Sequence, residues 1–313
     1  MADKISTREA YGNALVKLGA ENPDIVVFDA DLSKSTKTAG FKEAYPDRFF
    51  NAGIAEANMM GMAAGMAFSG KTVFASTFAM FAAGRAYEII RNSIGYPHAN
   101  VKICATHSGV TVGEDGASHQ CIEDLALMSV IPGMTVVHPA DGPSTEKLLR
   151  QVAAFDGPAY VRLGRLSVPV IYNDDSDIVL GKANTLRDGT DHTVIACGLM
   201  VNEALIAAEA LANDGISVRV IDMHTIKPFD EDAVVRAASE TKSIITAEEH
   251  SVIGGLGAMT ASVTARRCPC RVSMVGIQDR FGQSGKPEEL KKEYNITAAD
   301  IVKAVKEADE AVR

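Results

Sequence analysis

Residues 72–106 read TVFASTFAMFAAGRAYEIIRNSIGYPHANVKICAT, and this stretch decides the fold. Short apolar runs that include β-branched residues lie at its two ends, 72–76 and 101–106, and residues 81–95 between them have a helical pattern. A strand, a helix and a second strand in this order form a βαβ unit, whose two strands lie parallel in one sheet. The stretch therefore predicts an α/β protein.

The same alternation continues in both directions from this unit. Further strands are expected at 24–28, 135–137 and 159–163, and helices near 55–69, 120–130 and 143–155. Ser6-Thr7-Arg8-Glu9 has the spacing of a capping box, which predicts the start of a first helix with two satisfied backbone donors. We expect residues 1–172 to form a doubly wound domain with a mostly parallel sheet and helices on both faces.

A second α/β domain follows a polar stretch. Residues 172–177 (YNDDSD) and 187–190 (RDGT) are rich in turn formers, and we place a linker at 173–191. The alternation then restarts, with strands expected at 193–197, 217–221, 243–247 and 271–275 and helices near 202–213, 230–240, 256–267 and 298–312. Residues 192–313 are therefore expected to form a smaller, doubly wound domain.

Composition excludes several classes of partner. The 313 residues carry a net charge of −9, which argues against nucleic acid, because phosphate backbones need a basic surface. The N-terminus is polar, and the longest apolar stretch, 57–70, is too short and too rich in glycine to span a membrane. Three of the five cysteines lie in or beside apolar runs, where a thiol packs as a small apolar group. We expect a reduced, cytoplasmic protein with neither nucleic acid nor membrane as a partner.

Glu56 is the first candidate for chemistry. It directly precedes the apolar run that begins Ala57-Asn58-Met59-Met60. The carboxylate has one structural interpretation, in which it stabilises the positive end of the following helix. In the functional interpretation, the carboxyl group is partly buried beside apolar side chains and passes a proton near neutral pH.

Phe78 and Phe81 follow the strand expected at 72–76. Ligands of α/β sheets bind beyond the carboxyl ends of the strands, so the pair lies where a ligand is expected. Residues three apart share one face of a helical turn, and such a pair usually packs in the core. The alternative is a platform for a flat heteroaromatic ring.

The richest segment is ATHSGVTVGEDGASHQ, residues 105–120. A strand leads to His107, and the glycine-rich loop that follows carries Asp115 and His119. Two histidines and two carboxylates within thirteen residues suit hydrogen bonding to a polyhydroxylated ligand and proton transfer. Zinc is disfavoured because neither a cysteine nor a helical histidine spacing supports it, and no metal ligands are assigned in this chain.

Together these segments resemble the carboxy-terminal part of transketolase, a family that depends on thiamine diphosphate. Gly53-Ile54-Ala55-Glu56 resembles its G-I-x-E segment, and Thr77-Phe78-x-x-Phe81 resembles the aromatic pocket around the cofactor's aminopyrimidine. The segments that begin at Ala105 and Gly113 resemble the substrate channel, and 139–142 (PADG) and 163–165 (LGR) follow in the family's order. The resemblance implies a pyrimidine-binding domain followed by a transketolase C-terminal domain.

The resemblance also implies roles for individual residues. Glu56 would protonate N1′ of the aminopyrimidine, and Phe78 and Phe81 would hold that ring. His107, Asp115 and His119 would contact the sugar hydroxyls, with both histidines moving protons. Arg165 would bind a sugar phosphate, joined by Arg8 and Ser35, whose matches are weaker. The family often has a tyrosine where this chain has Gly84, and Tyr87 is the candidate substitute.

The half of transketolase that is missing from the match implies a partner. The family holds the diphosphate through Mg²⁺ (or Ca²⁺) with a Gly-Asp-Gly motif in an amino-terminal domain, and the sequence contains no Gly-Asp-Gly. We expect a separate subunit to supply that domain and bind the metal, in an α2β2 assembly active on sugar phosphates. The function implied is transfer of a two-carbon ketol unit from a ketose to an aldose.

Two other interpretations stay open from the sequence. A subunit related to deoxyxylulose-phosphate synthase or to the β subunit of 2-oxoacid dehydrogenase E1 shares the fold and the glutamate. A non-catalytic regulatory paralogue belongs to another class, and the presence of Glu56, His107, His119 and Arg165 argues against it. The sequence does not select the sugar, and sulfonated or branched ketoses stay among the candidate donors.

Overall fold

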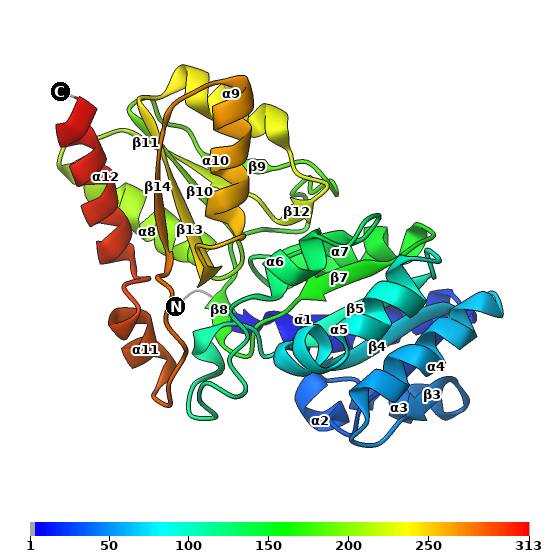
Figure 1. Cartoon of the computed structure of the whole chain (residues 1–313). Helices are drawn as coiled ribbons and strands as arrows, with labels where there is room; N and C mark the ends of the chain where they lie inside the picture. The colour runs from blue at the N-terminus through cyan, green and yellow to red at the C-terminus, as the bar shows by residue number, and fades with distance from the viewer. Residues whose placement is uncertain (1–3, 313) are drawn as a thin grey trace.

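The computed structural model describes residues 4–312, which form two α/β units side by side (Figure 1). The first sheet has seven strands in the order β12-β6-β7-β5-β4-β2-β3. Their bounds are β2 (Ile25–Asp29), β3 (Phe49–Asn51), β4 (Thr72–Phe78), β5 (Val101–Thr106), β6 (Thr135–Val137), β7 (Ala159–Arg162) and β12 (Thr225–Lys227). β4 and β5 are adjacent and parallel, with Val73 opposite Val101 and Phe78 opposite Thr106, so the βαβ prediction is confirmed.

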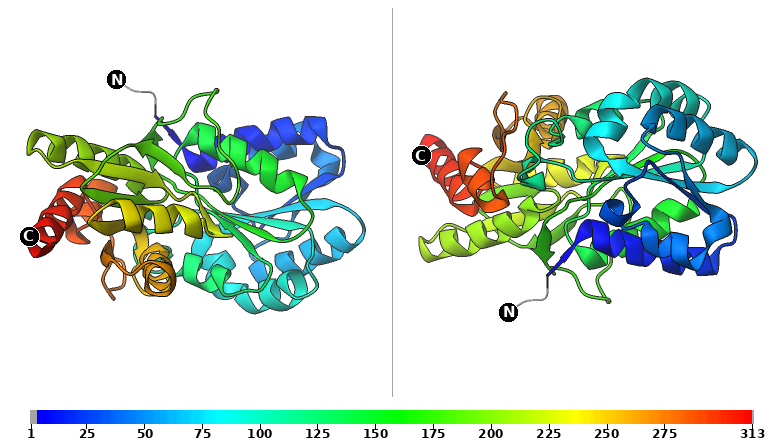
Figure 2. Two further views of the ribbon diagram at one scale, coloured as in Figure 1. Left: turned by 90° about the horizontal axis from the view of Figure 1, so that it is seen from above. Right: turned by 90° about the horizontal axis from the view of Figure 1, so that it is seen from below.

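Helices cover both faces of this sheet, as expected for a doubly wound domain (Figure 2). Two apolar clusters fill the spaces between helices and sheet, and they draw residues from opposite faces. The helices are α1 (Thr7–Glu21), α2 (Ser33–Thr36), α3 (Ala39–Ala44), α4 (Glu56–Phe68), α5 (Tyr87–Ile89), α6 (Asp124–Ser129) and α7 (Gly142–Ala154), with 3₁₀ turns at Pro46–Arg48 and Val110–Val112.

The second sheet has five strands in the order β14-β13-β10-β11-β9. β10 (His192–Ala196), β11 (Val218–Asp222), β13 (Ser243–Ser251) and β14 (Arg271–Ile277) are parallel, and β9 (Asn184–Arg187) runs antiparallel to β11. Its helices are α8 (Met200–Asn213), α9 (Glu231–Glu240), α10 (Leu256–Arg267), α11 (Pro287–Glu293) and α12 (Ala298–Val312). β9 lies within the stretch expected as linker, 173–191. A two-stranded antiparallel sheet of β1 (Lys4–Ser6) and β8 (Ser167–Pro169) completes the fold.

Three details differ from the sequence-based expectations. Ser6 precedes α1 but forms no side-chain cap, and Thr7 instead accepts a hydrogen bond from Gly164 N, because β1 pairs with β8. The helix expected at 81–95 consists of π-helical segments, Phe81–Arg85 and Ile90–Gly95, on either side of α5. β12 comes from the second half of the chain yet pairs antiparallel with β6 of the first sheet.

No helix within residues 4–312 combines the length and the apolar composition needed to cross a membrane.

Candidate active site

The candidate residues gather at the carboxyl edge of the seven-stranded sheet. β4 ends at Phe78 and β5 ends just before His107, and the pairing of Phe78 with Thr106 places both strand ends side by side. Phe81 follows on the first π-helical segment, and Glu56 is the first residue of α4, which packs against β4 and that segment. This is the edge at which parallel α/β sheets bind their ligands.

Four rings form the centre of the site. The Phe78 ring lies 3.8 Å from the ring of His107 and 5.7 Å from that of Phe81, both in stacked orientation. His119 points an edge-on ring at the two phenylalanines, at centroid distances of 6.2 and 5.3 Å. The structure thus brings together residues that are up to 41 positions apart in the sequence, 119 minus 78.

Glu56 is buried, with 3% of its surface exposed. Its Oε2 atom is enclosed and has no hydrogen-bond partner within the described residues. Burying a polar oxygen without a partner costs free energy, so such an oxygen marks a place where a bound donor is expected. The turn before it needs Gly53, whose φ of +72° disfavours any residue with a Cβ.

His107 is held as a neutral imidazole. Arg8 Nη1 lies 3.2 Å from Nε2, and Thr106 Oγ1 lies 2.9 Å from Nδ1. Because a guanidinium only donates, Nε2 accepts from Arg8 and Nδ1–H donates to Thr106. Burial first, and then the positive charges of Arg8 and Arg165, lower the pKa of His107 to about 3. His107 therefore acts at neutral pH as an uncharged hydrogen-bonding group.

Two arginines give the site its positive charge. Arg8 Nη1 also donates to the main-chain carbonyl of Ser35 at 2.9 Å, so Ser35 takes part through its backbone. Burial, followed by repulsion from Arg165, lowers the pKa of Arg8. Arg165 itself is 38% exposed and donates to Val112 O and to Glu114 Oε2, the latter at 3.3 Å.

The remaining loop residues are more exposed. His119 is half-buried, its Nδ1 lies 2.9 Å from Ser118 Oγ, and its Nε2 makes no hydrogen bond within residues 4–312. Asp115 is exposed on the same loop and has no side-chain hydrogen bond or ion pair within the described chain. Tyr87 packs against the apolar cluster under α4, and its ring makes no contact with Phe78 or Phe81 among the described residues. The substitution of Tyr87 for a tyrosine at position 84 stays a prediction.

Family models identify the two halves of the chain. The pyrimidine-binding domain of transketolase matches residues 3–170, and the transketolase C-terminal domain matches residues 181–301. The chain belongs to the transketolase family.

Relatives of this transketolase subunit match it over nearly its whole length. A Methanocaldococcus jannaschii protein described as a transketolase C-terminal section is 49% identical and covers 96% of this chain and 95% of its own. A 6-deoxy-6-sulfo-D-fructose transketolase subunit of a Clostridium species is 41% identical, with 97% and 94% covered. The solved structure of a split-gene transketolase, an inactive β4 tetramer, is 53% identical, has a TM-score of 0.92 and covers 99% of this chain and all of that one. These matches favour transketolase over the two alternative interpretations.

The structure adds residues that the sequence analysis missed. Asp29, at the end of β2, accepts hydrogen bonds from Leu32 N, Thr36 and Thr38, and so orders the segment that presents the Ser35 carbonyl to Arg8. Glu114 lies in the 105–120 motif, where the sequence assigned it no role. In the structure its carboxylate pairs with the guanidinium of Arg165. The sequence signal for it is an acid next to Asp115 in a loop expected to bind a charged ligand.

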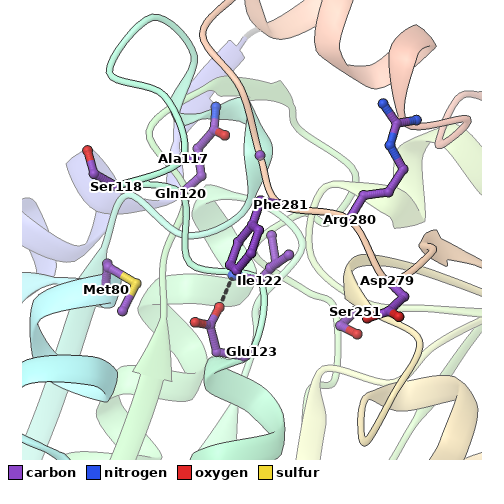
Figure 3. A pocket seen from close by; sticks show the side chains of 11 residues that line it. Met80, Ala117, Ser118, Gln120, Ile122, Glu123, Ser251, Asp279, Arg280 and Phe281 are labelled. Carbon is purple, nitrogen blue, oxygen red and sulfur yellow. Dashed lines mark hydrogen bonds between the residues drawn. The ribbon is translucent and has the colours of Figure 1, made fainter.

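A cavity of about 480 Å³ lies between this loop and the C-terminal domain (Figure 3). Figure 3 shows Phe281 in the middle of its lining, with Met80 and Ser118 on one side and Asp279 and Ser251 on the other. Met80 and Ser118 directly precede two site residues, Phe81 and His119. Loop residues next to the site therefore line this cavity.

Proposed function

We propose that this chain is the subunit of a split transketolase that binds the pyrimidine of thiamine diphosphate and most of the sugar. The observation that carries the proposal is the enclosed, unpartnered Oε2 of Glu56 at the same sheet edge as the stacked rings of Phe78, Phe81 and His107. A flat heteroaromatic ring with a basic nitrogen supplies what this arrangement lacks, namely a partner for the carboxyl and a surface for the phenyl rings.

Thiamine diphosphate fits these residues. When bound, it supplies the reactive thiazolium carbon that carries the two-carbon ketol unit. Phe78 and Phe81 would hold the aminopyrimidine, and Glu56 would share a proton with N1′. Within residues 4–312 no three His, Cys, Asp or Glu side chains gather as ligands for a metal ion. We assign the diphosphate and its Mg²⁺ (or Ca²⁺) mainly to a partner subunit.

The loop residues and the two arginines would have different roles in binding the sugar. His107 stays uncharged, because its pKa lies near 3, and both of its ring nitrogens are engaged, by Arg8 and by Thr106. A sugar hydroxyl would therefore bond to Nε2 by taking the place of Arg8. His119 has a free ring nitrogen, Nε2, and is the better group to move a proton at a hydroxyl. Asp115 is exposed and would bind a hydroxyl after the sugar enters. Arg165, with Arg8 behind it, would bind the terminal anion, which replaces Glu114 as its partner.

An exposed face of α4 supports a partner subunit next to Glu56. A Cβ added at Gly61 or Gly65 would meet no atom within 4 Å, and Met62 and Phe68 are exposed on the same helix. Ile54, two residues before Glu56, is 79% exposed. Exposed apolar side chains that cluster on one helix are typical of a protein interface. We propose that the diphosphate-binding subunit packs here, in an α2β2 assembly.

The test is reconstitution with an amino-terminal-type subunit and a panel of ketose donors. We expect transfer of a two-carbon unit to an aldose phosphate, dependent on thiamine diphosphate and a divalent metal. The panel includes phosphorylated, sulfonated and branched ketoses, because the name of one relative states a sulfonated sugar, 6-deoxy-6-sulfo-D-fructose. Decarboxylation of a 2-oxoacid without ketol transfer would overturn the proposal.

A further inference from the structure

The loop of residues 107–120 is held in place from the C-terminal domain. Apart from its 3₁₀ turn, Val110–Val112, it has no regular structure, although it carries His107, Asp115 and His119. Glu249 Oε1, at the end of β13, accepts a hydrogen bond from Thr111 N at 2.5 Å. Gln120 Nε2 donates to Gln283 O at 2.9 Å. The conformation of the loop therefore depends on groups more than 100 residues away.

Thr111 is the point at which these restraints meet. On one side of it, Val110 O accepts from Gln120 Nε2 at 3.0 Å, which ties the turn to the residue after His119. On the other side, Val112 O accepts from the guanidinium of Arg165. If the Thr111 amide is fixed, the carbonyls of Val110 and Val112 on either side of it are fixed too. These carbonyls position Gln120, which follows His119, and Arg165, which would bind the substrate anion.

Glu249 approaches the loop so closely that it also dictates the residue at position 109. Gly109 has φ +76°, and a Cβ there would lie 2.2 Å from the carboxyl carbon of Glu249. The carboxyl group is buried, and Arg162 Nη2 donates to the main-chain carbonyl of Glu249 at 3.1 Å. The loop, Glu249 and the first sheet therefore form one packed unit across the two domains.

We infer that Glu249 is a positioning residue of the active site: through Thr111 N–H, the C-terminal domain sets the geometry of the 107–120 loop and of Arg165 for the sugar. The inference rests on the proposed transketolase function. Glu249 is buried and its carboxyl contacts the loop backbone at Thr111 and Gly109, so it would act through the loop, on the substrate side of the site. Glu56, Phe78 and Phe81 lie on α4, β4 and the π-helical segment, outside its contacts.

The chain contains a matched control in the preceding residue. Glu248 is also buried at the end of β13, but its carboxylate accepts from Leu256 N at 2.7 Å and Gly257 N at 2.8 Å, at the start of α10. It thus serves a helix of its own domain and does not reach the loop. Replacement of either residue by alanine removes a buried carboxyl and leaves backbone donors without a partner.

The first test compares Glu249→Ala with Glu248→Ala in the complex with the diphosphate-binding subunit. For Glu249→Ala we expect kcat/KM for the sugar donor to fall by about 10- to 100-fold, because small displacements of binding groups cost rates of this size. Binding of thiamine diphosphate and hydrogen–deuterium exchange at its C2 atom should stay at the wild-type level. Glu249→Gln keeps an acceptor for Thr111 N and should restore most of the activity. Equal losses for the two alanine variants at matched thermal stability would overturn the inference.

The second test needs neither partner nor turnover. In the isolated chain, backbone amide exchange should become faster across residues 107–120 in Glu249→Ala, and across α10 in Glu248→Ala. Unchanged exchange of the loop in Glu249→Ala would overturn the inference even if the complex is active. A wild-type complex without ketol transfer would instead remove the proposed function, while the exchange result would still report on the loop. The two failures are therefore distinguishable.

Discussion

At the scale of single residues, Glu56 combines burial with one oxygen that has no partner. Glu56→Gln keeps the shape of the side chain but removes its acidic proton. We expect the fold to be intact and hydrogen–deuterium exchange at C2 of bound thiamine diphosphate to slow by about 10²- to 10⁴-fold, the usual effect of losing a placed proton donor. Glu231→Gln, which removes a carboxylate from the first turn of α9, controls for the loss of a helix N-terminal charge. Unchanged exchange would remove Glu56 from the mechanism.

A second prediction at the residue scale concerns Arg165, the residue proposed to bind the substrate anion. Its guanidinium is 38% exposed and is paired with the more exposed Glu114, a pairing that a phosphate or sulfonate replaces easily. For Arg165→Ala we expect KM for phosphorylated sugars to rise by about 10- to 100-fold, from about 1.5–3 kcal/mol for a charged hydrogen bond.

The matched control for Arg165 is Arg150→Ala, whose arginine is 40% exposed and paired with Glu21 and Glu146 on the surface. Steady-state kinetics with a short, unphosphorylated hydroxy-ketone donor completes the comparison, because that donor should be affected little by Arg165→Ala. Equal losses with both kinds of donor would make Arg165 structural.

At the scale of elements, the end of β13 carries two buried carboxyls. Glu249 faces the loop of the first domain, and Glu248 faces α10 of its own domain. Burial raises the pKa of each from 4.5 to about 7. The opposing effect comes first from the amides of Gly257 and Leu256 for Glu248, and first from the charge of Arg162 and then from Thr111 for Glu249. A carboxyl whose pKa is raised on folding favours the protonated form, so its stabilisation is present below pH 4.5 and is lost as the pH rises to 7.

Glu249→Gln removes this titration. The stability of the variant relative to wild type should therefore increase between pH 5 and 7, by an amount on the order of 3 kcal/mol at most. Denaturant unfolding of the isolated chain at pH 5, 6, 7 and 8 measures the difference, and histidines such as His138 and His250 affect both proteins alike. A difference that does not vary with pH would contradict the assignment.

The same scale shows what the sequence could predict. β4, β5 and the helices α7 to α10 were predicted because long apolar patterns report burial directly. The π-helical turns at 81–95 were not, because over five or six residues their period differs too little from that of an α-helix. β9 and β12 are strands of four and three residues, which become strands only through their neighbours.

The candidate site followed from motifs within the 51–120 region. The structure brings the rings of these motifs together, and the roles assigned to the residues stay predictions. The contacts that were missed join distant parts of the chain. Arg8 meets His107 across 99 positions, and Glu249 meets Thr111 across 138. Neither pair leaves a local pattern, so only the folded chain reveals that the C-terminal domain supports the loop.

At the scale of the whole molecule, the chain would bind only the pyrimidine half of the cofactor, so we predict that it is inactive alone. We expect the isolated subunit to show no ketol transfer and to bind thiamine diphosphate weakly, because a diphosphate is recognised mainly through its charge and its metal. Addition of the diphosphate-binding subunit should restore both properties. Calorimetry that shows tight, magnesium-dependent binding by this chain alone would contradict the assignment.

The strand β12 has a consequence for how the chain can be made and divided. It lies beside β6 and is fastened there by Lys227 Nζ, which donates to Ser129 O and Ile131 O at 2.8 and 2.6 Å. On the ribosome, the first sheet stays one strand short, with the β6 edge open to other chains, until residue 227 has been synthesised. A fragment that stops near residue 172 would keep that open edge permanently. A chimaera that takes its C-terminal domain from another family member therefore also takes β12, an edge strand of the first sheet, from that member.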